Sequence, residues 1–319
     1  MQSVRAIRHA RVEPQSAAAV VARATVLLSL VAGCRGPVLS VEDVIVRPGE
    51  KARLVAFVER EPILGLGKDI VGVQVRFDVA GQEVGDKKTN DEGRAEIKDR
   101  LPAGSDRYEA RAQVLHEQLR AMGRVFRWGD ERVILAVDVD HTIARTDYEE
   151  LLVERDEDGS DPLKRSAQTL RGWAQNFRIL YLTGRPRSLL EKTRAWLGEH
   201  AFPEGPVVMA ESVKQVLRPG DFKEKKLHAL RKDWPTLLIG VGNEPGDAEA
   251  YGANEMLALV LAGKGQRNFG RHAIVFRDWK ALARFVAANR EVLMDPKALK
   301  EVIAGKKLLL RHVDRYERE

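Results

Sequence analysis

The sequence predicts an all-β sandwich followed by an α/β region that is built on a mostly parallel sheet. Between residue 38 and about residue 128, apolar and polar residues alternate with a period of two, and helical periodicity is absent. From Arg132 onward, short apolar runs alternate with amphipathic stretches of helical length. Such alternation of strands and helices places the strands in parallel and covers both faces of the sheet with helices.

The β region contains several separate strand signals. Residues 71–79 alternate most clearly, residues 107–114 repeat the pattern, and residues 54–58 form a third apolar run after the turn Pro48-Gly49. Short strands with regular turns predict a β-sandwich. The stretch at residues 89–95 resembles bacterial immunoglobulin-like domains. No catalytic combination of residues is visible here, so we expect a spacer or docking module.

The α/β region is expected to contain six strands and four helices. The strands are predicted over residues 133–138, 178–182, 207–210, 237–241, 257–261 and 273–276. The helices are predicted over residues 162–175, 186–199, 223–232 and 277–289. In open α/β sheets of this kind, ligands bind at the carboxyl ends of the strands, so functional residues are sought there.

Composition limits the class of protein. The chain has 319 residues, of which 44% are hydrophobic and 31% are charged, so packed domains are expected and global disorder is excluded. The net charge of +6 favours acidic partners such as anionic lipid or phosphorylated substrates. Because the basic residues are spread along the chain and no nucleic-acid motif occurs, we expect no nucleic-acid partner. The sequence does not indicate an oligomeric state.

The first 34 residues have the pattern of a targeting segment. A basic leader precedes a short apolar stretch, residues 24–33, that is too short to span a bilayer. Residues 31–34, Val-Ala-Gly-Cys, resemble the lipobox of bacterial lipoprotein signals, and Cys34 is the single cysteine of the chain. This predicts lipidation at Cys34 and a lipid-anchored protein on the periplasmic side of a bacterial cell envelope. The alternative is a disordered leader or misassigned start, with a cytoplasmic protein.

The first chemical motif is Asp138-Val-Asp140-His-Thr142, which follows the first parallel strand. Hydrolysis of a phosphate monoester is extremely slow without a catalyst, and a covalent intermediate divides the barrier. Asp138 is the candidate nucleophile. Asp140 is the candidate acid/base, which protonates the leaving alkoxide and then activates water. Thr142 is expected to hold the loop through its hydroxyl group. The alternative interpretation of both carboxylates is that they are solvated loop residues.

The second motif ends the next strand. Thr183 and the backbone after it, at Gly184, are placed to bind a phosphate oxygen, because a helix is predicted to begin at Pro186. Arg185 either adds a donor to the substrate or forms a surface ion pair. Thr183 is therefore a catalytic candidate, and Gly184 and Arg185 are candidates for substrate binding.

The third and fourth motifs supply a cation and further acids. Lys223 is predicted to neutralise the phosphoryl group and Asp138, with Lys225 and Lys226 as rivals. Asp247 follows an apolar strand and a glycine-rich loop, where it can coordinate Mg²⁺, and Asn243 supports it. The cofactor expected is Mg²⁺, with Asp138, Asp140 and Asp247 as its ligands.

In combination, the four motifs resemble the haloacid dehalogenase-like phosphatases over about residues 132–280. The similarity is closer to the catalytic LNS2 domain of lipins, the magnesium-dependent phosphatidate phosphatases. It lies in the first motif with its trailing Thr146-Asp147, in residues 205–208, in Phe222-Lys223, and in residues 242–247 followed by Ala250-Tyr251.

The resemblance implies the same roles for Asp138, Asp140 and Asp247 as nucleophile, acid/base and metal ligand. It also implies a haloacid dehalogenase-like fold, and the short connection after the first motif leaves little or no room for a cap. Lipins couple this domain to an immunoglobulin-like one, as predicted here. Two departures from lipins bear on the substrate. His141 stands where lipins carry glycine, and the leader predicts export, whereas lipins act in the cytosol.

The predicted organisation is a leader at residues 1–34, a sandwich at 35–128, a phosphatase domain at 129–290 and a basic C-terminal helix at 291–319. In the last segment, apolar residues at helical spacing either lie on an anionic bilayer or pack onto the parent domain. These apolar residues are Leu299, Val302, Ile303, Leu309 and Val313.

The expected function is hydrolysis of a phosphate monoester, with phosphatidate or a related lipid phosphate as substrate. One alternative is a phosphatase of a soluble ester such as a nucleotide or sugar phosphate. Another is a non-catalytic binding protein of the cell envelope, in which the β-sandwich carries the function. A kinase is disfavoured, because neither a P-loop nor a kinase glycine-rich loop is present.

Overall fold

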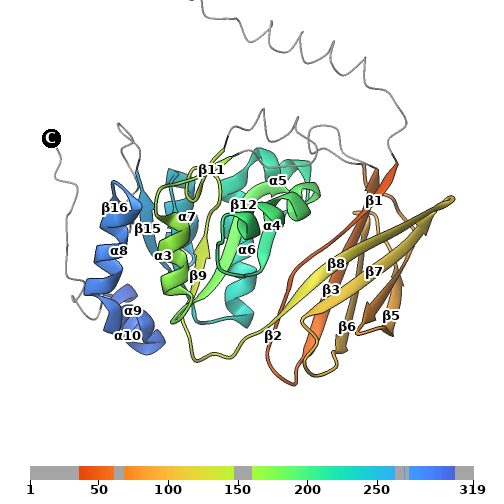
Figure 1. Cartoon of the computed structure of the whole chain (residues 1–319), viewed down its shortest axis with the longest axis horizontal. Coiled ribbons are helices and arrows are strands. Elements are labelled where there is room, and N and C mark those ends of the chain that lie inside the picture. Colours follow the sequence, from red (N-terminus) through yellow and green to blue (C-terminus); the bar gives the residue numbers. More distant parts are fainter. Residues whose placement is uncertain (1–35, 61–67, 147–159, 263–268, 270–272, 306–319) are drawn as a thin grey trace, which may run out of the picture. The chain divides into compact units, whose positions relative to one another are not determined.

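The computed structural model describes residues 36–60, 68–146, 160–262, 269 and 273–305 (Figure 1). The chain divides into two compact units, residues 1–36 and residues 37–319. The leader, including Cys34, and residues 306–319 lie outside the described residues, as does the whole of residues 147–159. Within the second unit we refer to residues 37–128 as the β region and to residues 129–305 as the α/β region.

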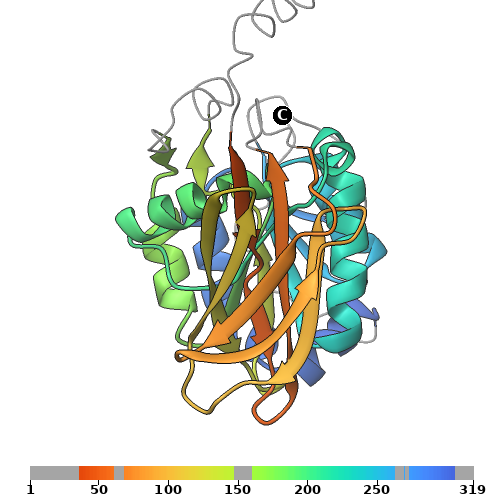
Figure 2. The same cartoon turned by 90° about the vertical axis from the view of Figure 1, so that its right-hand side faces the viewer.

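The β region contains two sheets, whose strands face the viewer in Figure 2. The first sheet joins β1 (Pro37–Val41), β3 (Lys51–Arg60) and β6 (Arg94–Arg100) in antiparallel order. The second has the order β2-β8-β7-β4-β5 and is antiparallel except where β2 meets β8. Its strands are β2 (Val44–Val46), β4 (Gln74–Val79), β5 (Gln82–Lys88), β7 (Arg107–Val114) and β8 (Glu117–Arg127).

The two sheets share one apolar core. Leu54 and Val58 of β3 belong to the same buried cluster as Val75 and Phe77 of β4, so inward-facing side chains of both sheets meet. Tyr108 is also buried there, and its hydroxyl donates to the carbonyl of Glu42 at 2.6 Å. The alternation of apolar and polar residues is therefore the pattern of two packed sheets, each with one face toward the core.

The α/β region is built on a six-stranded parallel sheet with the order β13-β12-β9-β14-β15-β16 (Figure 1). The strands are β9 (Ile134–Val137), β12 (Arg178–Pro186), β13 (Val207–Ala210), β14 (Leu237–Gly242), β15 (Leu257–Leu261) and β16 (Ala273–Phe276). A small antiparallel pair, β10 (Ala144–Arg145) and β11 (Asp161–Pro162), flanks the first motif. Every residue of β9, β14 and β15 is buried, which explains their uninterrupted apolar runs.

Successive residues of the central strands face opposite layers of helices. Leu135 and Tyr181 belong to a cluster that includes residues of α3 (Ser166–Trp173), α4 (Leu190–Glu199) and α8 (Trp279–Ala288). Ala136 and Leu180, one residue away on each strand, belong to a cluster with residues of α6 (Pro219–Asp233) and α7 (Pro245–Ala253). Helices therefore cover both faces of the sheet, as the βα alternation predicts.

All four predicted helices begin at different residues in the structure, and two of these differences lie beside the predicted motifs. The stretch expected to be helical from Pro186 remains extended through that proline, followed by the short 3₁₀ helix η1 (Arg187–Leu189) and then by α4. The reason is that Pro186 still pairs with Ala210 of β13 after an irregularity in the register. Helix α6 begins four residues earlier than predicted, with Pro219 at its first turn, and α5 (Val213–Leu217) precedes it.

The end of the described chain packs onto the α/β core. Helices α9 (Arg290–Met294) and α10 (Pro296–Ile303) contribute Leu293 and Leu299 to the core, both fully buried, and Ile303 packs against it. The described part of the amphipathic stripe thus follows the packing alternative, while Leu309 and Val313 lie outside the described residues. Among the described helices, none combines the length and the apolar character that crossing a bilayer requires.

Candidate active site

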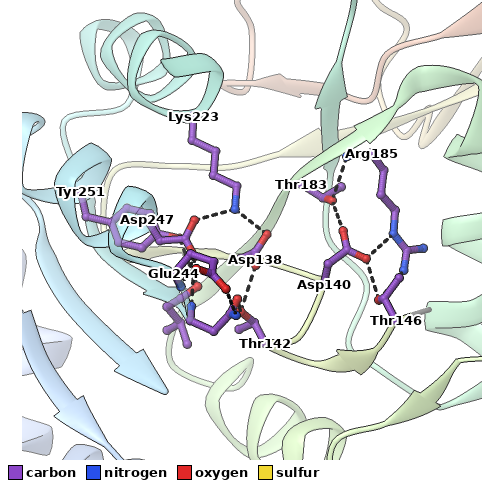
Figure 3. Close-up of polar contacts among 12 residues, drawn as sticks. Asp138, Asp140, Thr142, Thr146, Thr183, Arg185, Lys223, Glu244, Asp247 and Tyr251 are labelled. Atoms are coloured by element: carbon purple, nitrogen blue, oxygen red, sulfur yellow. Dashed lines mark hydrogen bonds and ion pairs between the residues drawn. The ribbon is translucent and has the colours of Figure 1, made fainter. Parts of the chain in front are cut away.

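The predicted motifs meet at the carboxyl ends of three neighbouring strands (Figure 3). Asp138 and Asp140 follow β9, Thr183 and Arg185 lie near the end of β12, and Asn243 follows β14. Two helices on one face add Lys223, which follows the first turn of α6, and Asp247, which lies in the first turn of α7. Because β9 lies between β12 and β14, residues that are more than 100 positions apart in sequence share one site.

Asp138 lies at the centre of the site. Its carboxylate is buried, accepts a hydrogen bond from Lys223 Nζ at 2.6 Å and lies 2.9 Å from the Thr142 hydroxyl. Burial raises the pKa of Asp138 to about 7, because the charge of Lys223 only partly offsets burial and the nearby charges of Asp247 and Asp140. The carboxylate therefore lies where additional positive charge would stabilise its ionised form.

Lys223 joins two carboxylates. Its Nζ also donates to Asp247 Oδ1 at 2.6 Å, so one ammonium group bridges Asp138 and Asp247 (Figure 3). Burial lowers the pKa of Lys223, but the two carboxylates outweigh burial and hold that pKa well above its usual value. Of the rival lysines, Lys225 is exposed and Lys226 pairs with Glu42 and Glu211. The structure thus brings Lys223 to Asp138.

Asp247 is oriented by the start of helix α7. Its Oδ2 accepts the backbone N–H groups of Asn243 at 3.0 Å and Glu244 at 3.1 Å, in a reciprocal capping arrangement with Glu244. A Cβ atom on Gly242 would lie 2.5 Å from this oxygen, so glycine is required at that position. The glycine-rich loop after β14 therefore lets the Asp247 side chain approach the backbone of the loop closely.

Thr142 lies between Asp138 and Asn243 and contacts both. The Thr142 hydroxyl lies 2.9 Å from Asp138 Oδ2 and 2.9 Å from Asn243 Oδ1, and Thr142 is fully buried. Its carbonyl accepts the indole N–H of Trp279 at 2.8 Å, which ties the loop to the start of α8. Both residues thus contact the groups around Asp138, Thr142 in the structural role that the sequence suggests.

Asp140 is held by a separate set of donors. Its Oδ1 accepts Arg185 Nε at 2.9 Å and the Thr146 hydroxyl at 2.7 Å, and its Oδ2 accepts the Thr183 hydroxyl at 2.9 Å. Burial raises the pKa of Asp140, but the charge of Arg185 and these hydrogen bonds outweigh burial and keep the pKa below its usual value. Asp140 is therefore ionised at neutral pH.

Arg185 lies behind Asp140 and contacts it directly. Its side chain is fully buried and also reaches the hydroxyls of Thr146 and Thr193. These contacts hold the guanidinium beside Asp140, and the predicted role of Arg185 in substrate binding stays a prediction. Gly184, the other predicted substrate contact, is half-buried, and a Cβ there would lie 2.8 Å from the Cβ of Pro219. Thr146 was not among the predicted site residues, although the trailing Thr146-Asp147 dipeptide was a signal for it.

His141 has a backbone conformation that suits glycine. Its φ angle is 55°, in the left-handed region, and its side chain is exposed directly after the buried Asp140. A non-glycine residue in this region stores strain of order 1–3 kcal/mol. The strained backbone at His141 therefore lowers the stability of the fold, while the imidazole remains exposed next to Asp140 in the sequence.

The described residues offer two carboxylates, rather than three, to a divalent cation. No group of three or more His, Cys, Asp or Glu side chains suited to a metal occurs in the described ranges. Asp138 and Asp247 converge on one point, which the Lys223 ammonium occupies. Their hard oxygen atoms and the raised pKa of Asp138 fit Mg²⁺. The oxygens of Asp140 accept hydrogen bonds from Thr183, Thr146 and Arg185 instead, and its role as a third ligand stays a prediction.

Comparison with protein families adds one result. Residues 135–257 match the family model described as PITM 1-3, LNS2 domain. The LNS2 match spans β9 to the start of β15 and so includes all the residues of the site. It supports the resemblance of the α/β region to the lipin-type catalytic domain. No curated protein matches the chain in sequence.

Solved structures that resemble the chain do so weakly. Titin M4 is 15% identical, with 30% of this chain and 100% of that chain covered and a TM-score of 0.22. Extracellular domains 3–5 of Drosophila OTK are 13% identical over 34% of this chain and 42% of that one, with a TM-score of 0.21. A carbohydrate acetylesterase from Xanthomonas citri is 13% identical over 83% and 74%, with a TM-score of 0.29. At these TM-scores, none of the three supports a conclusion about the LNS2-matching region.

Proposed function

We propose that the α/β region is a magnesium-dependent phosphatase of the haloacid dehalogenase-like type, which hydrolyses phosphatidate or a related lipid phosphate. The observation that carries the proposal is the bridge from Lys223 to both Asp138 and Asp247, at 2.6 Å each, beside an ionised Asp140. A nucleophilic carboxylate, a buried cation and a separately held acid/base are the parts that phosphoryl transfer through aspartate needs. The LNS2 match supports the same assignment.

In the first step, an oxygen of Asp138 attacks phosphorus and the ester oxygen leaves with the bonding electron pair. Lys223 donates to Asp138 and Asp247 and offsets the negative charge that would otherwise repel the phosphate. Magnesium, when bound by Asp138 and Asp247, supplies positive charge that lowers the repulsion between carboxylates and phosphate. The Thr183 hydroxyl already donates to Asp140, the proposed acid/base.

In the second step, water attacks the phosphorus of the acyl phosphate and the bond to Asp138 breaks. Asp140 takes the proton from this water. It can do so because its lowered pKa keeps the carboxyl group ionised in the free protein. To protonate the leaving alkoxide in the first step, Asp140 must bind a proton when the substrate is bound. The negative charge of the phosphate favours this, because a like charge nearby raises the pKa of a carboxyl group.

The proposal of a lipid substrate is tested by phosphate release from phosphatidate in vesicles, with and without Mg²⁺. Wild-type protein should release phosphate only with Mg²⁺, and Asp138→Asn should abolish release. Asp221→Asn is the matched control, because Asp221 is an exposed carboxylate on the same helix as Lys223 and should have no effect. Activity that persists in Asp138→Asn would refute the covalent mechanism.

A panel of water-soluble esters separates the alternatives. Faster turnover of nucleotide or sugar phosphates than of phosphatidate would replace the lipid substrate with a soluble one. Failure to hydrolyse any ester, including para-nitrophenyl phosphate, with Mg²⁺ present would favour a binding protein. In that case the β region, for which we propose an immunoglobulin-like fold, would be the place to look for a ligand.

We further propose attachment to a bacterial cell envelope through lipid on Cys34. The support is the sequence pattern alone, because the leader lies outside the described residues. Mass spectrometry of the mature protein should show a lipidated N-terminus at Cys34, and Cys34→Ala should release the protein from the membrane fraction. An unmodified mature protein that begins before Cys34 would contradict the anchor.

A further inference from the structure

Cationic side chains of the α/β region reach acidic side chains of the β region at three places. Arg187, Arg194 and Lys226 pair with an acidic set that consists of Glu42, Asp43, Glu59 and Asp69. Two of these cations are close in sequence to site residues. Arg187 directly follows β12, which carries Thr183 and Arg185, and Lys226 lies on α6, which carries Lys223. The contacts therefore connect the β region to the segments that form the active site.

Arg187 has the most extensive of these contacts. Its Nη2 donates to Glu59 Oε2 at 2.8 Å and to Asp69 Oδ1 at 2.8 Å. The guanidinium also lies 4.2 Å from the centre of the Phe57 ring, and its other amino group donates to the Glu211 carbonyl. Arg187 and Glu59 are almost fully buried, so their interaction is only weakly screened by water.

The chain between Arg187 and the active site is short. Thr183 and Arg185, which both donate to Asp140, precede Arg187 by four and two residues. One of the residues between is Gly184, whose backbone has more freedom than that of any other residue. A Cβ atom at this position would lie 2.8 Å from the Cβ of Pro219, so a larger residue would not fit without a shift. Fixing Arg187 at the far end of the segment therefore restricts the segment that holds Asp140.

Two further pairs hold the surroundings of this segment. Arg194 of α4 donates to Asp43 at 2.5 Å, and the fully buried Asp43 side chain also accepts the backbone N–H of Val207 at 2.9 Å. Lys226 donates to Glu42 at 3.3 Å, one helical turn after Lys223. Hence α4, β13 and α6, which surround β12, each contact the acidic set.

We propose that Arg187 is a positioning residue, through which Glu59 and Asp69 of the β region hold the Thr183–Arg185 segment against Asp140. The β region would then complete the active site instead of serving as a spacer or docking module. This inference rests on the proposed phosphatase function for its kinetic consequence, but its structural consequence is independent of activity. The simpler alternative is that Arg187 only fastens the two regions together.

Arg47 provides a control for simple fastening. Arg47 also joins the two regions: it pairs with Asp130, donates to the carbonyl of Asp233, and lies 4.5 Å from the centre of the Trp234 ring. Asp233 is the last residue of α6, at the far end of that helix from Lys223. If Arg187 only fastens the regions, Arg187→Gln and Arg47→Gln should have similar effects. If Arg187 positions the segment, the two variants should differ in the segment and in turnover.

The first measurement is hydrogen exchange of the backbone amides, followed by mass spectrometry on the full chain. Arg187→Gln should speed exchange at residues 183–189 by tenfold or more relative to wild type, and Arg47→Gln should not. Arg187→Lys should restore part of the protection, because it keeps the charge. Unchanged exchange in this segment in Arg187→Gln, with Glu59→Gln giving the same result, would overturn the proposal.

The second measurement is the steady-state rate with the substrate that wild type prefers. Misplacing catalytic groups by about 1 Å costs roughly 100-fold in rate, so Arg187→Gln should lower kcat by 10-fold to 100-fold with a smaller change in KM. Arg47→Gln should keep kcat within twofold. Equal losses in the two variants would also overturn the proposal. A wild-type protein without turnover, combined with faster exchange in Arg187→Gln, would refute the phosphatase and leave the positioning role supported.

Discussion

Arg185 and Asp140 form a buried ion pair, with 2.9 Å between Nε and Oδ1, in which neither side chain is more than 7% exposed. Removing one member of such a pair is costly, about 3–5 kcal/mol, because the other is left as an uncompensated charge. The pair therefore determines both the position and the ionisation of Asp140. The same contact places Arg185 beside the proposed acid/base.

The first prediction concerns the pH dependence of Arg185→Gln. The guanidinium is the largest influence that lowers the pKa of Asp140, so without it burial prevails and the pKa rises. Asp140 must be ionised to accept a proton from water in the second step, so under conditions where that step limits turnover the acidic limb of the profile of kcat against pH should move to higher pH. The control is Arg178→Gln, at the opposite end of β12, which should leave the limb in place. An unchanged limb in Arg185→Gln would show that Asp140 is not tuned by Arg185.

The second prediction concerns magnesium. A ligand present at 100 times its Kd stabilises the folded state by about 2.7 kcal/mol, so Mg²⁺ should raise the Tm of wild type by several degrees and EDTA should reverse this. Asp138→Asn and Asp247→Asn should lose the shift, whereas Asp140→Asn should keep it because the Asp140 oxygens already accept hydrogen bonds. Loss of the shift in Asp140→Asn would restore that side chain as a metal ligand.

The third prediction concerns Gly242. A Cβ at this position would lie 2.5 Å from Asp247 Oδ2, so Gly242→Ala should displace Asp247 and destabilise the fold by about 1–3 kcal/mol, with loss of activity. Gly198→Ala in α4 is the comparison, because no atom lies within 4 Å of the position that a Cβ atom would take there. Urea unfolding should show a gain of up to about 1 kcal/mol for Gly198→Ala. Similar stability of the two variants would contradict the close approach.

The fourth prediction concerns His141, whose left-handed backbone favours glycine. His141→Gly should raise the free energy of unfolding by about 1 kcal/mol, and His141→Asn should give a smaller gain because asparagine tolerates this region better than most residues. Thermal unfolding at fixed pH measures both. If His141→Gly instead lowers the Tm, the imidazole contributes contacts that outweigh the strain.

Much of the α/β region was predictable because its strands are buried on both faces. Strands β13, β15 and β16 have the predicted boundaries, since an uninterrupted apolar run marks a parallel strand whatever its neighbours are. The first helix was predicted too long. Pro162 pairs in β11, and Arg165 has a φ of 73° at the cap, so α3 starts only at Ser166. These features depend on tertiary contacts, which the local pattern of apolar and polar residues does not contain.

The site was predictable only where position along a strand determines it. Asp138, Thr183 and Asp247 follow strands that the pattern identifies, and the structure brings them to one edge of the sheet. The partner of Arg185 was not predictable, because Asp140 lies 45 residues away and any nearby acid would fit the pattern equally well. The contact of Arg187 with Glu59 spans 128 residues and two regions, for which the sequence contains no signal.

The strand order has a consequence for biosynthesis. Strand β9 is the first of the parallel sheet to be synthesised, yet it lies in the interior between β12 and β14. Until residue 242 has left the ribosome, one flank of this wholly apolar strand has no neighbour to pair with. Exposed strand flanks of this kind promote aggregation. A nascent chain stalled between residues 190 and 236 should therefore depend on chaperones for solubility far more than the finished polypeptide does.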